Sequence, residues 1–199
     1  TSFIISPEGL VLDKQVGYAE GFLMKIMSPT NLSTYNKETW EKQQEEILLY
    51  ENRLAEQAKS VAPGNNYKEI RCKGVDGEEI ALSDVIAKNR YVLLDFWASS
   101  CVPCMHELPH LLAAYEKYHS KGLEIYALSL DNDKNAWRNT IKEKDMSWVN
   151  VLRESTEVSE QYGVRGVPSN FLIDCSTGKI VAVHLRGDAL IAKLMELFE

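Results

Sequence analysis

The chain has 199 residues, a length that accommodates one domain of ordinary size together with a smaller additional segment. Its 22 basic and 29 acidic residues give a formal net charge of −7 without a basic cluster, which argues against nucleic acid or an anionic membrane surface as a partner. Hydrophobic residues make up 45% of the chain, enough for a packed core, but no apolar run reaches the roughly 18 residues of a membrane-spanning helix.

Residues 1–28 resemble a stretch near the other end of the chain, 169–197. Both stretches have an apolar strand, a turn, a second strand and a short amphipathic helix in the same order: Phe3–Ile5 and Pro7–Gly9 in the first, Phe171–Ile173 and Ser176–Gly178 in the second. Similarity in a fixed order predicts an internal repeat. The alternative is an unrelated hairpin followed by a helix.

Residues 29–65 are predicted to form a linker followed by a helix. The stretch Thr39–Lys59 is rich in Glu, Gln, Lys, Leu and Ala, and its apolar residues fall near helical spacing. It has no residue pattern with chemistry of its own, so we expect a docking or spacer helix. The Pro- and Gly-containing stretch Val61–Asn66 marks the clearest domain boundary, and we place one domain over residues 66–199.

The rest of the chain alternates between strand and helix patterns. Strands are predicted at 67–72, 78–82, 91–97, 123–130, 148–152, 169–174 and 179–185, and helices at 83–88, 101–120, 131–144, 155–162 and from 188 onward. Ser83 is the predicted N-cap of the first helix, and residues 131–133 cap the third. This order predicts an α/β fold with a mixed sheet flanked by helices, preceded by a hairpin and helix appendage.

The stretch Asp95–Pro109 reads DFWASSCVPCMHELP and holds two cysteines three residues apart. The apolar run before them is typical of a buried strand, and the residues after them have helical spacing. Cys101 is therefore expected at a helix N-terminus, with Cys104 one turn further on the same side. Unpaired N–H groups and the helix dipole favour a thiolate there, so Cys101 is the candidate nucleophile and Cys104 the resolving thiol.

Other uses of such a pair have different requirements. A zinc site would need a second pair of ligands, and although His106 and His110 are near, no second pair follows. Haem attachment would need a histidine directly after Cys104, where the chain has Met105. We favour redox chemistry, with a zinc site or a purely structural pair as the remaining alternatives, and expect no metal and no cofactor.

These residues resemble the active site of thioredoxin-fold proteins, in particular the ResA/TlpA-like extracytoplasmic branch. Asp95 lies six residues before Cys101, where thioredoxins have a buried aspartate, and Glu107 lies three after Cys104, where the ResA/TlpA-like branch has a glutamate. Pro109 matches a helix-kinking proline, and 166–168 (Gly-Val-Pro) resembles the family's cis-proline loop. The resemblance spans residues 66–199 and implies a thioredoxin-like sheet.

The resemblance also implies roles for these residues. A buried Asp95 with a raised pKa would accept a proton from Cys104, and Glu107 is the second candidate for proton handling. Their alternatives are a satisfied core aspartate and an exposed helix glutamate. Pro168 is expected to follow a cis peptide bond and to face the disulfide, where the loop backbone would pair with an extended substrate segment.

Four further residues are candidates for substrate contact: Trp97, Val102, Pro103 and Val167. Plain core packing is the alternative for Trp97. Because Val102 and Pro103 bring no charge to stabilise a thiolate strongly, we expect a reductant rather than a strong oxidant. Ser100 stands where most relatives have tryptophan, which should leave Cys101 more accessible.

The resemblance implies a thiol–disulfide oxidoreductase that reduces disulfide-bearing extracytoplasmic proteins. An upstream thiol reductant, typically a membrane thiol carrier, would regenerate it in the periplasm or on a membrane anchor facing the periplasm. The alternatives are a peroxidase, for which Ala98 replaces the expected threonine, and a redox-inert interaction module. Residues 1–28 would be the tail of an upstream thioredoxin-like domain and could self-associate. Cys72 and Cys175 are either bonded to each other or free.

Overall fold

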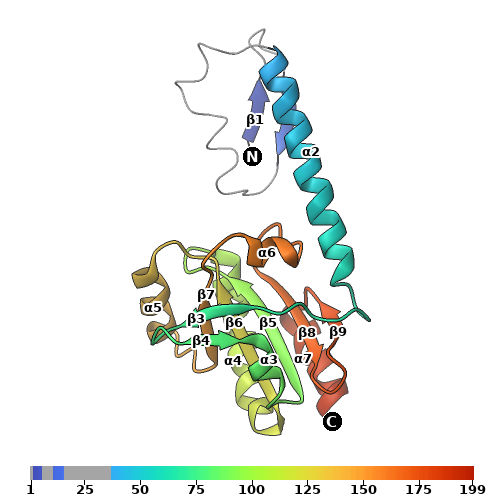
Figure 1. The fold of residues 1–199 in the computed structure, drawn as a ribbon. Coiled ribbons are helices and arrows are strands. Elements are labelled where there is room, and N and C mark those ends of the chain that lie inside the picture. Colours follow the sequence, from blue (N-terminus) through green and yellow to red (C-terminus); the bar gives the residue numbers. More distant parts are fainter. Residues whose placement is uncertain (1, 6–10, 16–36) are drawn as a thin grey trace. The chain divides into compact units, whose positions relative to one another are not determined.

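The computed structural model describes residues 2–5, 11–15 and 37–199, with side chains from residue 42 onward. Figure 1 labels most of the helices and strands of these residues. By its contacts the chain divides into two compact units, Thr1–Leu48 and Leu49–Glu199.

Strands β1 (Ser2–Ile5) and β2 (Val11–Gln15) form an antiparallel hairpin in the first unit. The two strands predicted for this stretch are therefore confirmed. The amphipathic helix predicted after them lies outside the described residues, as does most of the linker. Helix α2 (Lys37–Ser60) is continuous across the division between the units and lies close to the predicted helix.

A seven-stranded mixed sheet forms the centre of the second unit. The strands, in chain order, are β3 (Arg71–Gly74), β4 (Glu79–Ala81), β5 (Tyr91–Trp97), β6 (Leu123–Ser129), β7 (Val149–Leu152), β8 (Ser169–Asp174) and β9 (Lys179–Val183). Their order across the sheet is β4-β3-β7-β6-β5-β8-β9. The central strand β5 runs parallel to β6 and antiparallel to β8, so the predicted mixed sheet is confirmed.

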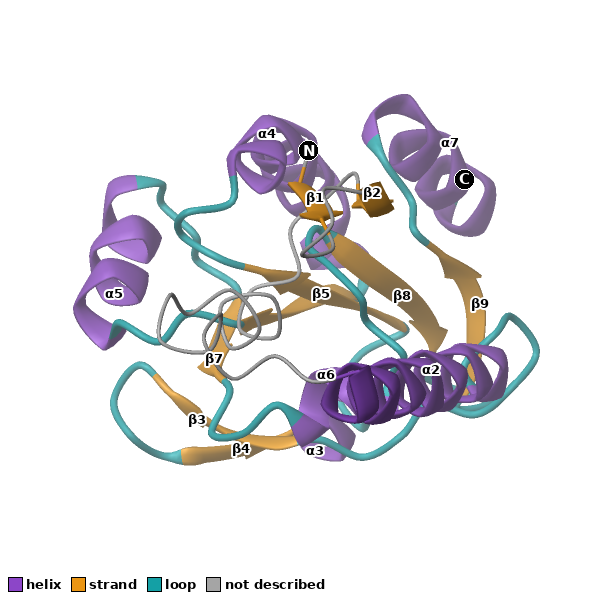
Figure 2. Cartoon of the chain, turned by 90° about the horizontal axis from the view of Figure 1, so that it is seen from above, coloured by secondary structure: helices purple, strands orange, loops and turns teal. Residues whose placement is uncertain are grey.

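Helices cover both faces of this sheet. They are α3 (Leu82–Ile86), α4 (Val102–Tyr118), α5 (Lys134–Glu143), α6 (Glu157–Gln161) and α7 (Gly187–Phe198), with a short 3-10 turn η2 (His119–Lys121) after α4. Figure 2 shows α4, α5 and α7 along one face and α3 and α6 along the other. Alternate residues of β5 enter the two cores, Leu93 and Trp97 on the α4 side and Val92 and Phe96 on the other. Burial on both faces explains why this strand is apolar throughout except at Asp95.

The two predicted helix caps had different outcomes. Asp133 accepts hydrogen bonds from the N–H groups of Asn135 (2.8 Å) and Ala136 (3.3 Å), so the predicted start of α5 is confirmed. The predicted cap at Ser83 is wrong, because β4 runs directly into α3 and the N-cap is Ala81, which makes no side-chain cap.

The second half of α2 packs on α6 and on the segment that follows it. Leu54 is 2% exposed, and Arg53 forms an ion pair of 3.0 Å with Glu160. Gly163 has a positive φ of 62°, and a Cβ there would lie 2.5 Å from the backbone nitrogen of Ala58. The backbones therefore approach more closely than a side chain would allow.

Candidate redox site

The two cysteines lie where β5 gives way to α4. Cys101 is the N-cap of α4, and its Sγ accepts a hydrogen bond of 3.1 Å from the backbone N–H of Cys104, to which it is joined by a disulfide. Cys104 is 5% exposed, whereas Cys101 is only partly buried. The predicted arrangement is confirmed: the first sulfur is the more accessible one and sits against helix N–H groups that would stabilise its thiolate.

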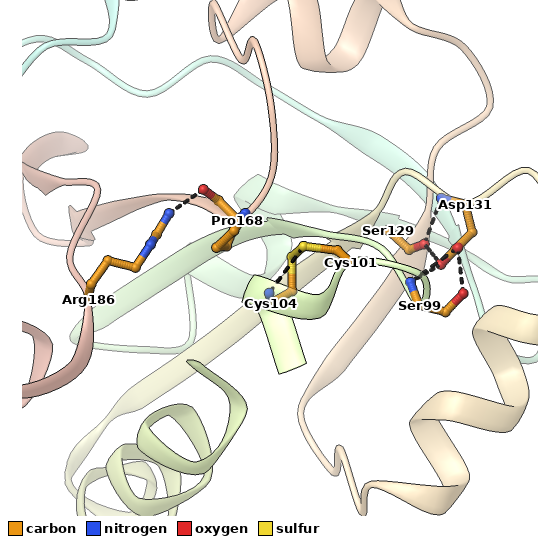
Figure 3. The surroundings of a disulfide bond; sticks show 7 residues. All are labelled: Ser99, Cys101, Cys104, Ser129, Asp131, Pro168 and Arg186. Carbon is orange, nitrogen blue, oxygen red and sulfur yellow. Dashed lines mark hydrogen bonds between the residues drawn. A yellow bond between two sulfur atoms is a disulfide. The ribbon is translucent and has the colours of Figure 1, made fainter. Parts of the chain in front are cut away.

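A carboxylate holds the loop that leads into Cys101. Asp131 accepts hydrogen bonds from the backbone N–H of Ser99 (2.9 Å), from the Ser99 hydroxyl (2.7 Å) and from the Ser129 hydroxyl (2.7 Å). Figure 3 shows this cluster on one side of the disulfide and Pro168 on the other. The sequence grouped Asp131 with the α5 cap and missed this contact, which arises because β5 and β6 are parallel and end at the same edge.

Asp95 lies on β5, opposite Asn170 of β8, and is 5% exposed. Burial raises the pKa of its carboxyl group to about 7, because the charged form is poorly solvated there. The positive charge of Arg186 works against this rise, the negative charge of Glu107 adds to it, and hydrogen bonding from Asn170 opposes it. Asp95 can therefore exchange a proton near neutral pH.

A small cavity connects the buried carboxyl group with the second cysteine. Its volume is about 10 Å³, close to the space that one water molecule needs. Its lining includes Asp95, Trp97, Cys104, Glu107, Pro168 and Arg186. The predicted resolving thiol and the predicted proton acceptor thus belong to residues that line the same small cavity.

Glu107 lies one turn beyond Cys104 on α4 and is partly buried. Its carboxylate accepts a hydrogen bond of 2.8 Å from the backbone N–H of Gly187, the first residue of α7. The alternative of a freely exposed helix glutamate is therefore wrong. Its part in proton handling stays a prediction.

The Val167–Pro168 peptide bond is cis, as predicted. The carbonyl oxygen of Pro168 accepts a hydrogen bond from the guanidinium group of Arg186, which Figure 3 shows reaching toward it. Arg186 falls between the strand predicted at 179–185 and the helix predicted from 188 onward, and the sequence alone indicated no role for it at the site. No local pattern signals this contact, because it joins residues eighteen positions apart.

The candidate substrate contacts divide into surface and core positions. Val102 is 62% exposed and Pro103 is also exposed, both in the first turn of α4 beside Cys101. Val167 is partly buried next to the cis-proline. Trp97 is 2% exposed, which favours the core-packing alternative for its side chain.

The other two cysteines are free. Burial raises the pKa of the Cys72 thiol to about 11 and that of Cys175 to about 12, so neither forms a thiolate readily. Cys72 and Cys175 are therefore not bonded to each other, and of the two alternatives the structure shows free thiols.

Among the residues with described side chains, no three His, Cys, Asp or Glu groups are placed to hold a metal ion. Within the described part of the chain, no helix has the length and apolar character needed to cross a membrane.

Comparison of the chain with known protein families and relatives supports a redox role for the two cysteines. Residues 63–183, more than half of the chain, match the AhpC/TSA family. The chain belongs to the AhpC/TSA family. This AhpC/TSA chain is 33% identical over 135 residues to the thiol-disulfide oxidoreductase ResA of Bacillus cereus, which covers 68% of this chain and 76% of the relative.

Two further likenesses extend the comparison. The thiol-disulfide oxidoreductase ResA of Halalkalibacterium halodurans is 29% identical over 153 residues, covering 76% of this chain and 85% of the relative. The thioredoxin domain of a thiol-disulfide oxidoreductase from Bacteroides vulgatus has a TM-score of 0.65 and 35% identity, covering 70% of this chain and 100% of that one. This AhpC/TSA chain is a thioredoxin-fold thiol–disulfide oxidoreductase, so the predicted fold and enzyme class are confirmed.

Proposed function

We propose that the protein reduces disulfide bonds in extracytoplasmic proteins. The observation that carries the proposal is the placement of the two sulfurs. Cys101 is accessible at the N-terminus of α4, and Cys104 lines a water-sized cavity together with Asp95. One thiol is thus placed to attack a substrate, and the other is placed to lose its proton to a neighbouring base.

The reaction has two exchange steps. The Cys101 thiolate attacks one sulfur of the substrate disulfide, which forms a mixed disulfide and releases the other substrate sulfur as a thiolate. Cys104 then gives its proton to Asp95 and attacks Cys101 Sγ. The Cys101–Cys104 disulfide forms, and the second substrate sulfur leaves with the electron pair and takes up a proton. Two electrons pass to the substrate, and a dithiol donor must return them.

The direction and the location rest on the resemblance to the ResA/TlpA-like branch. Because Val102 and Pro103 place no charge between the cysteines, the dithiol should be a good reductant. An upstream thiol reductant, of the membrane thiol carrier type, would regenerate it, and the protein would act in the periplasm or from a membrane anchor. Fractionation of cells that produce the native full-length protein tests the location. Recovery with the cytoplasmic proteins would contradict it.

Residues 1–28 would belong to a second thioredoxin-like unit and mediate self-association. An isolated hairpin buries little apolar surface and leaves strand edges unpaired. Light scattering on the chain with and without residues 1–28 tests this, and an unchanged molecular mass would contradict it. Insulin reduction by the two chains should be alike.

Insulin reduction with dithiothreitol tests the function itself. We expect the protein to accelerate insulin precipitation and to consume hydrogen peroxide no faster than the Cys101→Ser variant. Rapid thiol-dependent peroxide consumption would favour a peroxidase instead, and no effect on either substrate would favour a redox-inert module.

A further inference from the structure

We propose that Arg186 is a positioning residue of the redox site. It ties the cis-proline loop in place through the Pro168 carbonyl and holds a fixed positive charge beside the carboxylates that serve Cys104. The inference rests on the proposed dithiol chemistry of Cys101 and Cys104. The two exchange steps at Cys101 and Cys104 do not themselves require the turn that contains Arg186.

The backbone of this turn is fixed by a buried amide. Asn170 is 2% exposed, its amide nitrogen donates to the Leu185 carbonyl oxygen (2.9 Å), and its amide oxygen accepts from the Leu185 N–H (2.8 Å). Both hydrogen-bonding groups of Leu185 are thus satisfied by one side chain of β8. Arg186 follows directly, so its Cα is held against the strand that begins after Pro168.

The guanidinium group is fixed as well. One of its nitrogens donates to the Pro168 carbonyl oxygen, and the other donates to the Leu185 carbonyl oxygen at 2.7 Å. Arginine can make both contacts at once because its donors lie in a rigid plane. The next residue, Gly187, donates its N–H to Glu107 of α4. The turn therefore links the cis-proline loop to the helix that carries both cysteines.

The same side chain brings charge to the cavity. Arg186 lines it together with Asp95 from β5 and Glu107 and Cys104 from α4. Two further titratable groups lie nearby: His184, whose pKa is lowered by burial and by the Arg186 charge, and His110, which approaches Gly187. Arg186 also lowers the pKa of Asp95, whereas Glu107 raises it. The cation therefore offsets part of the cost of burying Asp95 in its ionised form.

Two effects on catalysis follow, and they can be separated. Loss of the charge should leave Asp95 protonated to a higher pH, so that it accepts the Cys104 proton less readily near neutrality. Loss of the tether should let the cis-proline loop move, which weakens binding of an extended protein substrate more than reaction with a small disulfide. The guanidinium hydrogen bonds of Arg186 go to backbone carbonyl oxygens, so its proposed role is one of positioning.

Two substitutions separate charge from tether. Arg186→Met removes both, and Arg186→Lys keeps the charge but not the paired donors. Arg71→Met is the control, because it removes an exposed positive charge on β3, three strands from β5. The measurements are the pH dependence of mixed-disulfide resolution by stopped flow, and KM and kcat for insulin and for a small aromatic disulfide.

For Arg186→Met we expect the resolution profile to move to higher pH, with a rate roughly threefold to tenfold lower at about pH 6.5. We also expect KM for insulin to rise severalfold while the small disulfide reacts nearly as before. Arg186→Lys should restore the pH profile but not KM. Wild-type profiles and KM in both folded variants would overturn the proposal, as would equal losses for both disulfides.

Direct titration of Asp95 tests the role of the Arg186 charge independently of the proposed disulfide reduction. The carboxyl carbon of Asp95 can be followed by NMR in the oxidised protein, which needs no substrate. Arg186→Met should raise the Asp95 pKa, and Arg186→Lys and Arg71→Met should leave it near the wild-type value. If the wild-type protein reduced no protein disulfide, the proposed function would fail while this titration still decided the role of the Arg186 charge. An unchanged Asp95 pKa in Arg186→Met would refute that role.

Discussion

The carboxylate of Glu107 accepts a hydrogen bond of 2.8 Å from the backbone N–H of Gly187. Helix α4, which carries both cysteines, is thereby joined to the N-terminus of α7. A negative charge at a helix N-terminus is favourable, and the same charge acts on the buried Asp95 nearby. One side chain thus contributes both to packing and to the electrostatics of the site.

Glu107→Gln separates these two contributions. The amide oxygen can still accept from Gly187, so the free energy of unfolding should change by less than about 1 kcal/mol. Removal of the negative charge should lower the pKa of Asp95, the opposite of the change expected on removing Arg186. NMR titration of the oxidised protein measures this, and a raised Asp95 pKa would contradict the assignment.

Asp95→Asn should stabilise the oxidised protein at alkaline pH. The folded-state pKa of Asp95 is raised to about 7 from its ordinary value near 4, so folding holds a proton that the unfolded chain releases between these values. The wild-type protein therefore loses stability as the pH rises from about 4 to about 7. Above about pH 7 the folded protein bears the full cost of burying the ionised Asp95 carboxylate. Denaturation at about pH 8 should show a gain on the order of 2–4 kcal/mol.

The pH dependence of that gain is the informative part. At about pH 4 Asp95 is protonated in the folded protein and only about half ionised in the unfolded chain, so Asp95→Asn should differ from the wild type by less than about 1 kcal/mol. A gain that is equal at both pH values would mean that Asp95 does not titrate as described. In the reduced enzyme the same substitution should slow resolution of the mixed disulfide more than its formation, because Cys104 loses its proton acceptor.

Substitution of the two cysteines should have distinct outcomes. Cys101→Ser should abolish disulfide reduction, since it removes the sulfur at the helix N-terminus. Cys104→Ser should accumulate mixed disulfides that mass spectrometry can identify. Alkylation of the reduced protein at mildly acidic pH should modify Cys101 first, and preferential labelling of Cys104 would reverse the assignment.

Gly163→Ala should destabilise the domain through helix α2. A Cβ at this position would lie 2.5 Å from the Ala58 nitrogen and 2.7 Å from the Leu54 carbonyl oxygen, both backbone atoms. Gly77 is a matched control, because its φ of 91° is also positive but nothing lies within 4 Å of its Cβ position. Both substitutions carry the cost of a left-handed residue, roughly 1–2 kcal/mol, and only Gly163→Ala adds a clash.

Urea denaturation of the two variants measures the difference. Trypsin cleavage after Arg53 or Lys59 should also become faster in Gly163→Ala, since the second half of α2 would leave its contact with the domain. Equal stability of the two variants would show that this half of α2 is not part of the folding unit. We expect the folding unit to begin within α2, ahead of the boundary predicted near residue 65.

Those parts of the site that depend on residues close together in the sequence could be predicted from it. The spacing of Cys101 and Cys104 after an apolar strand is local, and resemblance extended it to Asp95, Glu107 and Pro168. The contacts of Asp131 with Ser99, and of Arg186 with Pro168, join separate segments through the sheet and leave no local pattern. The failed cap at Ser83 has a related cause, since the tertiary path of β4 overrides a local preference.

The reduction potential of the Cys101–Cys104 couple tests the central claim most directly. Equilibration with defined glutathione and dithiothreitol buffers, read out by alkylation and mass spectrometry, gives this value for the folded protein. A protein-disulfide reductant should have a potential of about −220 mV or lower, on the thioredoxin side of the scale. A potential near about −120 mV, where strong oxidants lie, would contradict the proposed direction of electron flow.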